Sequence, residues 1–242
     1  MVLDYGGVDL LSLDAGNTII FLDHARLEAI AREAGHDVAA ATLIACEGSA
    51  KRALSGDGEL VDVAWAHRAA PGASGWGAML GTLFARAGIP RSALPALLER
   101  LWTSHVEHNL YSKVPEGFVE AMQLVRSRGV KVAVVSNSEG MLERLFAKLG
   151  ILSCFDAVVD SAKVGVEKPD AGIFRIACER TGTTAARALH LGDTLATDIE
   201  GARNAGMRFA LIDPFGHYEG MYPDVPRVES AVAVARAIAA LR

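Results

Sequence analysis

A single acidic residue, Asp14, stands between an apolar run and a sequence typical of a tight turn. The run extends over residues 8–13, and the turn sequence is Ala15-Gly16-Asn17-Thr18. This pattern predicts a buried strand that presents a carboxylate at its carboxyl end, where open α/β sheets carry their ligand sites. An ionised carboxylate in that position can attack an electrophile or bind a cation. Asp14 is therefore the first candidate for a reactive residue.

Further polar side chains follow two later apolar runs. Ser136 and Asn137 come directly after the β-branched stretch 130–135. Asp193 follows the apolar stretch that ends at Gly192, and Asp198 comes five residues later. Two carboxylates at this spacing around a turn can converge on one cation, and a site of hard oxygen ligands suits Mg²⁺. A hydroxyl and a backbone amide at the neighbouring strand end can hold an oxyanion.

Lys168 is the candidate cation of the same site. It precedes Pro169, which disfavours helical backbone at Lys168, so its ammonium can reach inward to an anionic ligand. Taken singly, a serine after a strand is usually a turn residue, and a lysine beside a proline is usually solvated. The joint occurrence of these segments at predicted strand ends and helix entries favours one shared site.

From about residue 114, helical and strand patterns alternate. Proline near a start and glycine after an end delimit the helices, and β-branched runs mark the strands. Strands separated by crossover helices predict a parallel sheet covered on both faces, with right-handed connections. The expected helices are residues 115–128, 139–149, 170–180 and 195–204, and the expected strands are residues 130–136, 157–160, 188–192 and 207–212.

Residues 21–112 interrupt this alternation with a helical insertion. Apolar residues recur at helical spacing, as Leu97 and Leu101 do, and no convincing strand pattern is present. Glycine-containing loops at 55–59 and 71–75 divide the insertion into four or five helices. We therefore predict two domains, a core of residues 1–20 and 113–242 and a helical domain of residues 21–112.

Composition excludes several classes of partner. The chain carries 24 Lys and Arg against 29 Asp and Glu, a formal net charge of −5, which argues against a nucleic-acid-binding surface. No stretch approaches the roughly 20 apolar residues of a membrane span. No Lys or Arg precedes Arg26, so the basic segment of a secretory signal is lacking. Three cysteines without metal-type spacing fit a reducing compartment. We expect a soluble, cytoplasmic protein with no membrane partner.

In chain order, the segments 8–18, 132–137, 165–170 and 189–198 resemble the four motifs of the haloacid dehalogenase-like (HAD) hydrolase superfamily. The helical insertion corresponds by position to the cap of the members with a helical (C1) cap. The overall layout is similar to that of the HAD-like hydrolase domain 3-containing group. The resemblance implies an α/β fold, a Rossmann-like doubly wound parallel sheet with an inserted all-helical cap domain.

The same resemblance implies a Mg²⁺-dependent hydrolase, most simply a phosphatase that acts on a small phosphorylated molecule through an aspartyl-phosphate intermediate. Asp14 would be the nucleophile and Asp193 a Mg²⁺ ligand. Asp198 would bind the ion or hold its water shell and Lys168, and Thr18 would order the turn through a side-chain hydrogen bond. The implied catalytic residues are Asp14, Ser136 and Lys168. The implied substrate-binding residues are Ser136, Asn137, Lys168 and Thr18. The implied metal ligands are Asp14, the carbonyl of Gly16, Asp193 and Asp198.

The turn departs from the family pattern at two positions. Asn17 stands where the family most often has Gly, a mild change because Asn tolerates left-handed backbone. Gly16 stands where phosphatases of the family usually have an Asp that protonates the leaving oxygen and later activates water. Such acid–base help is worth about 10² to 10⁴ in rate, so we expect slow transfer from alkyl esters to Asp14 and less loss with aryl or acyl phosphates. His24 is the candidate replacement acid, because histidine carries protons near neutral pH.

Other activities remain open at this point. A dehalogenase attacks carbon with its Asp and needs no divalent ion, which leaves Asp193 and Asp198 unexplained. A phosphonate-cleaving enzyme needs a cap lysine that forms an imine, and Lys51, the only lysine of the insertion, is expected to face solvent. A non-catalytic phosphate-binding HAD-like protein is a third alternative, since a fold can keep a site without its activity. A homodimer is also left open.

Overall fold

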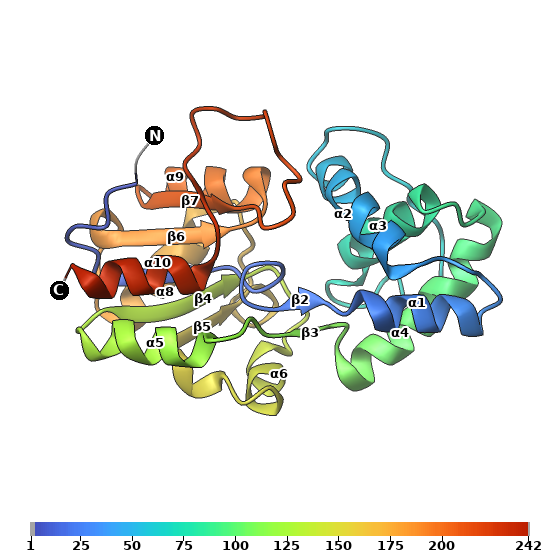
Figure 1. The fold of residues 1–242 in the computed structure, drawn as a ribbon. Helices are drawn as coiled ribbons and strands as arrows, with labels where there is room; N and C mark the ends of the chain where they lie inside the picture. The colour runs from blue at the N-terminus through green and yellow to red at the C-terminus, as the bar shows by residue number, and fades with distance from the viewer. Residues whose placement is uncertain (1–2, 242) are drawn as a thin grey trace. The chain divides into compact units, whose positions relative to one another are not determined.

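The structure is a computed structural model that describes residues 3–241. The chain divides into two compact units, and we describe each by itself (Figure 1). The core unit comprises Met1–Phe21 and Lys113–Arg242, and the helical unit comprises Leu22–Ser112. Among the described residues, no helix combines the length and the apolar character that crossing a bilayer requires.

A six-stranded parallel sheet forms the centre of the core unit (Figure 1). Its first strand is buried at all four residues, as expected where helices cover both faces of a parallel sheet. The sheet confirms the predicted α/β class. In spatial order the strands are β5 (Ala157–Asp160), β4 (Lys131–Ser136), β1 (Leu10–Leu13), β6 (Ala188–Gly192), β7 (Arg208–Ile212) and β8 (Arg227–Val228).

Helices cover both faces of this sheet (Figure 1). On one face α5 (Phe118–Ser127) packs against α10 (Ala231–Ala240), so the apolar carboxyl-terminal segment forms a docked helix. On the other face α8 (Ala171–Thr181) crosses β1, β4 and β5 and packs beside α9 (Glu200–Asn204). The other helical segments of the core unit are η2 (Leu152–Cys154), α6 (Leu142–Lys148), α7 (Ser161–Val164), η3 (Ala185–Arg187) and η4 (Leu195–Ile199).

The carboxyl end of β1 lies at the topological switch point of the sheet. After β1 the chain adds β4 and β5 on one side, then returns to add β6, β7 and β8 on the other. Open α/β sheets bind ligands at this point. Leu10 of β1 packs with Phe174 of α8, and Ser12 and Asp14 follow on the same face because side chains alternate along a strand.

Two helices begin three residues later than the sequence pattern predicts. Helix α5 begins at Phe118 because Gly117 adopts a left-handed conformation with φ of 72°. Helix α6 begins at Leu142 because the carboxylate of Asp160, at the end of β5, accepts hydrogen bonds from the backbone N–H groups of Gly140 (3.1 Å) and Leu142 (3.3 Å). A local sequence pattern cannot predict such a contact between the ends of two strands.

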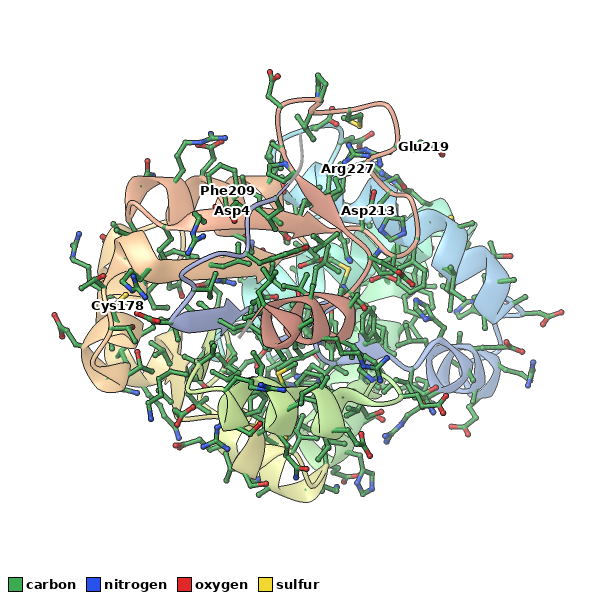
Figure 2. All side chains as sticks on the ribbon, turned by 60° about the vertical axis from the view of Figure 1, so that its left-hand side comes forward. Asp4, Cys178, Phe209, Asp213, Glu219 and Arg227 are labelled. Carbon is green, nitrogen blue, oxygen red and sulfur yellow. The ribbon has the colours of Figure 1, made fainter. Side chains whose placement is uncertain are left out.

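Side-chain hydrogen bonds fix the segment between β7 and β8, around which Figure 2 labels Asp213, Glu219 and Arg227. The carboxylate of Asp213 accepts hydrogen bonds from the backbone N–H groups of His217 (2.7 Å) and Tyr218 (2.9 Å). The Arg227 guanidinium donates to the carbonyl oxygens of Tyr218 and Met221. Strand β8, which ends this segment, has two residues and was not predicted.

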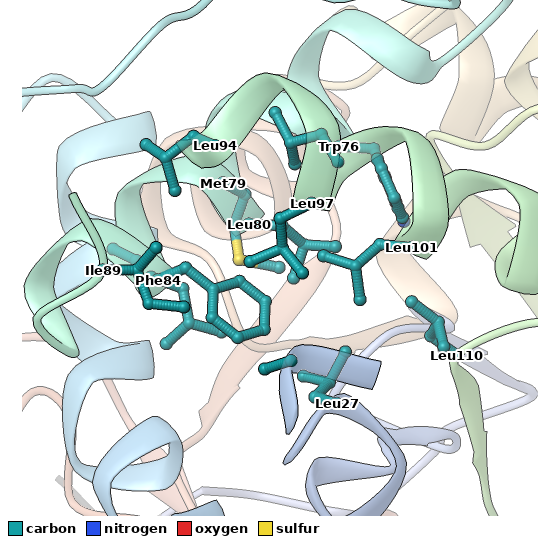
Figure 3. Close-up of a cluster of buried hydrophobic side chains, with 14 of the residues drawn as sticks. Leu27, Trp76, Met79, Leu80, Phe84, Ile89, Leu94, Leu97, Leu101 and Leu110 are labelled. Atoms are coloured by element: carbon teal, nitrogen blue, oxygen red, sulfur yellow. The ribbon is translucent and has the colours of Figure 1, made fainter. Parts of the chain in front are cut away.

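The helical unit is built around one apolar cluster, which Figure 3 shows in close-up. Leu27, Leu80, Phe84 and Leu101 belong to it and are fully buried. Short strands pair where the chain leaves and re-enters the core unit, too short to give a strand pattern in the sequence. The elements are β2 (Phe21–Leu22), α1 (His24–Glu33), α2 (Ala40–Leu54), α3 (Ala73–Arg86), η1 (Arg91–Ala93), α4 (Leu94–His108) and β3 (Tyr111–Lys113).

Candidate active site

Three of the predicted polar residues stand at the carboxyl ends of adjacent parallel strands. Asp14 follows β1, Ser136 ends β4 and Asp193 follows β6, and all three are buried. The backbone N–H of Asp14 donates to the carbonyl of Leu191 at 2.8 Å, which ties the end of β1 to β6. The parallel register therefore brings these side chains to one edge of the sheet.

Lys168 joins two of the predicted acids directly. Its ammonium nitrogen lies 2.5 Å from Oδ1 of Asp14 and 2.5 Å from Oδ1 of Asp198. All three side chains are more than nine-tenths buried. The hydrogen bond from Lys168 to Asp14 connects residues 154 positions apart in the chain, so the fold, and not local sequence, makes this contact.

Burial and mutual attraction shift the pKa values of this group. Burial raises the pKa of Asp14 to about 7; Lys168 opposes the rise, and Asp198 and Asp193 add to it. Burial alone would also raise the pKa of Asp198, but Lys168 and His190 lower it to about 2. Burial opposes the charged form of Lys168 as well, yet Asp14 and Asp198 raise its pKa above the usual value. Lys168 and Asp198 are therefore charged at neutral pH, and Asp14 gains or loses its proton there.

The donor set fits a divalent cation. Asp14, Asp193 and Asp198 are buried, and each offers a carboxylate oxygen such that the three atoms lie within 4.8 Å of one another. The ammonium of Lys168 contacts two of these carboxylates, those of Asp14 and Asp198. Three hard carboxylate oxygens this close together suit Mg²⁺.

A close approach of backbone and side chain places Asp198. The predicted helix 195–204 is divided into the π-helical turn η4, which contains Asp198, and α9. The backbone N–H of Thr194 donates to Oδ2 of Asp198 at 3.0 Å. A Cβ at Gly192 would lie 2.2 Å from Cγ of Asp198. Glycine at this position is therefore a spatial requirement of the Asp198 conformation.

Two residues without a predicted role extend this group beneath the strand ends. Nε2 of His190 lies 3.3 Å from Oδ1 of Asp198, and Nδ1 lies 2.9 Å from the Oγ of Ser12 on β1. His190 and Ser12 are both fully buried, and the rings of His190 and Phe174 pack in a T-shaped arrangement with centroids 4.9 Å apart. Burial lowers the pKa of His190 below its usual value. A polar residue within an otherwise apolar strand was the available signal for each of them.

The turn after Asp14 is held by backbone hydrogen bonds. The carbonyl of Ala15 accepts from the N–H groups of Ile19 and Ile20, each at 3.0 Å, and Asn17 is left-handed with φ of 53°. The expectation that Thr18 orders the turn through its hydroxyl is wrong, because that hydroxyl is buried without a hydrogen-bond partner among the residues described. The left-handed Asn17 agrees with the sequence interpretation.

Asn137 binds the backbone of the segment that carries Lys168. Its Oδ1 accepts from the N–H of Lys168 at 2.8 Å, and its Nδ2 donates to the Lys168 carbonyl at 3.0 Å. These two hydrogen bonds tie the residue after β4 to the lysine that contacts Asp14. One N–H of the Asn137 amide remains for a ligand, since a primary amide has two.

Tyr218 is a further buried polar residue near the acidic group. It packs with Ile199, which follows Asp198, and with Leu211 of β7. Its hydroxyl is buried and makes no hydrogen bond to the described residues. Burial, together with the charges of Asp193 and Asp198, raises its pKa above the usual value. No sequence pattern singled out this tyrosine.

Comparison with known proteins decides the family. The profile of haloacid dehalogenase-like hydrolases matches residues 8–206, well over half of the chain. The chain belongs to the haloacid dehalogenase-like hydrolase family. The resemblance read from the four motifs is thereby confirmed, and the protein is a HAD-like hydrolase.

Two relatives and one solved structure illustrate what this HAD-like hydrolase is similar to. Haloacid dehalogenase-like hydrolase domain-containing protein 3 of Mus musculus is 35% identical over 130 residues, 53% of this chain and 51% of the relative. Ribulose-1,5-bisphosphate 5-phosphatase of Halopiger xanaduensis is 31% identical over 126 residues, 52% and 51% of the two chains. The chain thus spans about half the length of these curated relatives. The magnesium-bound HAD-hydrolase YfnB of Bacillus subtilis shares the fold, with a TM-score of 0.66, 16% identity and coverage of 96% and 98%.

The helical unit of this HAD-like hydrolase contains a second buried charged group. Glu47 is fully buried, and its carboxylate lies 2.8 Å from Nε2 of His24 and 3.3 Å from the ammonium of Lys51. The expectation that Lys51 faces solvent is wrong, because its side chain is only 8% exposed. Leu43, Glu47 and Lys51 follow one another at intervals of four on the buried face of α2. That face encloses charge as well as apolar side chains.

Proposed function

We propose that this HAD-like hydrolase is a Mg²⁺-dependent phosphatase that acts on a small phosphorylated molecule through an aspartyl-phosphate at Asp14. The observation that carries the proposal is the buried contact of Lys168 with both Asp14 and Asp198, beside Asp193, at the switch point of the sheet. The phosphatase relative that matches half of the chain supports the reaction class. The helical unit is proposed as the cap.

In the first step, a carboxylate oxygen of Asp14 forms a bond to phosphorus while the bond from phosphorus to the leaving oxygen breaks. Oδ1 of Asp14 is bonded to Lys168, and Oδ2 has no hydrogen-bond partner among the described residues, which makes Oδ2 the attacking atom. Water then cleaves the acyl phosphate, releases inorganic phosphate and restores the carboxylate. Two steps of this kind are the pattern of nucleophilic catalysis.

The other residues of the site lower the cost of bringing two anions together. We assign Asp14, Asp193, Asp198 and the carbonyl of Gly16 to the Mg²⁺, which when bound supplies positive charge against the phosphoryl oxygens. The ammonium of Lys168 adds further positive charge beside the phosphoryl group, since it is hydrogen-bonded to Asp14. The proposed phosphoryl-oxygen donors are the Ser136 hydroxyl, the free N–H of Asn137 and Thr18, whose buried hydroxyl has no other partner among the described residues.

Gly16 limits the leaving groups that this site can expel. Without a side chain it cannot protonate a departing alkoxide, so phosphates with good leaving groups should be the faster substrates. The backbone of Gly16 does not adopt positive φ, so a side chain there meets no conformational penalty of that kind. This makes the position open to a direct test.

The test compares Gly16→Asp with Gly16→Asn, which has nearly the same size but no acid. We expect Gly16→Asp to raise turnover of an alkyl phosphate by about 10² to 10⁴, the usual worth of general acid–base help, and to change an aryl phosphate much less. Gly16→Asn should give no such gain. An equal response of both substrates to both variants would count against the leaving-group argument.

A panel of substrates with and without Mg²⁺ tests the activity itself. Turnover of aryl, acyl or sugar phosphates only with Mg²⁺ supports the proposal. Metal-independent turnover of a haloacid would instead show a dehalogenase. Mg²⁺-dependent binding of phosphate ligands without turnover of any would show a non-catalytic phosphate-binding protein.

Phosphonate cleavage is the second candidate, and the burial of Lys51 is the observation that favours it. Lysines that form imines are usually shielded from solvent, because desolvation lowers their affinity for a proton. The Lys51 ammonium lies 3.3 Å from the carboxylate of Glu47, a contact that an imine at Lys51 would lose. Borohydride reduction in the presence of phosphonoacetaldehyde tests for phosphonate cleavage, since only an imine mechanism leaves a covalent adduct on Lys51.

A further inference from the structure

A continuous chain of contacts runs from the nucleophile into the interior of the sheet. It begins at Asp14, passes through Lys168 and Asp198, and ends at His190 and Ser12. His190 and Ser12 face each other in register on the neighbouring strands β6 and β1. The proposed function uses the first three members and gives no role to the last two.

The hydrogen-bond partners assign the protonation of the His190 ring. Oδ1 of Asp198 belongs to a carboxylate and can only accept, so the Nε2 of His190 must donate to it. In a neutral imidazole the other nitrogen is then an acceptor, and the hydroxyl of Ser12 is the donor that faces it. Asp198 thus fixes the proton on Nε2, and Ser12 supplies the hydrogen-bond partner of the other ring nitrogen.

Asp198 depends on few contacts for its orientation. Its Oδ2 accepts from the N–H of Thr194, and its Oδ1 accepts from Lys168 and His190. His190 alone among these three partners approaches from within the sheet. Phe174 packs against its ring and limits its movement.

We propose that Ser12 and His190 are positioning residues that hold Asp198, and through it Lys168 and the cation, in place for the reaction at Asp14. This inference rests on the proposed function but is testable apart from it. Partners that orient metal ligands are typically worth about 10- to 100-fold in metal affinity or activity. Neither residue touches the substrate in this arrangement.

Two amide variants of His190 form the matched test. His190→Gln places an N–H near the position of Nε2, whereas His190→Asn is one methylene shorter and cannot reach Asp198. We expect His190→Asn to weaken Mg²⁺ binding, measured by calorimetry, by about 10- to 100-fold, and to lower kcat more than it raises KM. His190→Gln should restore most of both. Equal Mg²⁺ affinity in the two variants would overturn the proposal.

Two further measurements need no catalytic turnover. In long-range ¹H–¹⁵N spectra, His190 should show a proton on Nε2, and a ring protonated on Nδ1 alone would overturn the assignment. Ser12→Ala should weaken Mg²⁺ binding by a smaller factor than His190→Asn, and no change would remove Ser12 from the proposal. Should His190→Asn fail to fold, the spectrum of the unmodified protein still decides. Absence of turnover with every phosphate substrate would reject the proposed function. The Mg²⁺-binding and spectroscopic results would still test the roles of Ser12 and His190.

Discussion

Each unit of the protein buries a group of charged side chains, and the two groups differ in the number of carboxylates and basic side chains that they contain. In the core unit the ammonium of Lys168 contacts Asp14 and Asp198, and Asp193 adds a third carboxylate to the group. In the helical unit the one carboxylate of Glu47 lies between Lys51 and His24. Three carboxylate oxygens that lie this close together suit a bound cation, whereas Glu47 contacts basic side chains of its own unit. The convergence of carboxylates, more than burial, marks the candidate binding site.

Replacement of the nucleophile is the largest expected effect. Asp14→Asn keeps the shape of the side chain but removes the attacking oxygen, so turnover of an aryl phosphate should fall by at least about 10⁴. The variant should remain folded, because it removes one of several like charges from a buried group. Steady-state kinetics and thermal unfolding measure the two quantities. Turnover within tenfold of the unmodified enzyme would exclude Asp14 as the nucleophile.

Substitution in the charged group of the helical unit should have the larger effect on the stability of the fold. Glu47→Gln removes the carboxylate that lies 3.3 Å from the buried Lys51 ammonium, and we expect the free energy of unfolding to fall by about 3–5 kcal/mol. Asp193→Asn in metal-free protein is the matched control, since it removes one of three neighbouring carboxylates and should destabilise less. Urea unfolding of both variants tests the contrast. A larger loss in Asp193→Asn than in Glu47→Gln would reverse the comparison.

Mg²⁺ should stabilise the protein through the core group alone. At a concentration of about 100 times its Kd, a ligand that binds only the folded state adds about 2.7 kcal/mol to the free energy of unfolding. We expect this increment, measured by urea unfolding with Mg²⁺ or with EDTA, to vanish in Asp193→Asn and to persist in Glu47→Gln. Persistence in Asp193→Asn would place the ion elsewhere.

The smallest effect is a pH dependence of the metal-free protein. Asp14 has a pKa raised to about 7 in the folded state, above the value of about 4 in an unfolded chain. The folded state then binds a proton that the unfolded state does not, so this group lowers stability as pH rises from about 4 to about 7. Asp198, with a pKa lowered to about 2, contributes stability that is lost only as pH falls below about 4.

Asp14→Asn should flatten the decline between about pH 4 and 7, which urea unfolding in EDTA at several pH values would show. Saturating Mg²⁺ should also reduce the decline, because a cation favours the ionised carboxylate. A decline of the same size in Asp14→Asn would assign it to other groups.

Much of the core unit was predictable because its central strands, such as β1 and β6, are buried at every residue. The strands 157–160 and 188–192 were predicted at the residues where they are found, since continuous apolar runs mark such strands. Helix starts were predicted less well, because Asp160 and a left-handed Gly117 set them from outside the local pattern. The short strand β8 gave no signal.

The candidate site was predictable only as a set of residue types. The motifs suggested that Asp14, Lys168, Asp193 and Asp198 belong together, and the structure brings them within reach of one another. The sequence did not show the second layer of contacts, because a hydrogen bond such as Ser12 to His190 joins residues 178 positions apart. The burial of Lys51 was also missed, although its spacing of four from Glu47 and eight from the buried Leu43 was visible.

The two glycines of the site differ in what they allow. At Gly192 the first carbon of any side chain would occupy the volume already taken by the Asp198 carboxylate group, 2.2 Å away, so even alanine would displace Asp198 and, with it, the partner of Lys168. At Gly16 the backbone φ is not positive, so a side chain there meets no penalty from left-handed backbone. Position 192 therefore admits one amino acid for as long as the site is used, whereas position 16 is the place where a substitution tests the leaving-group preference.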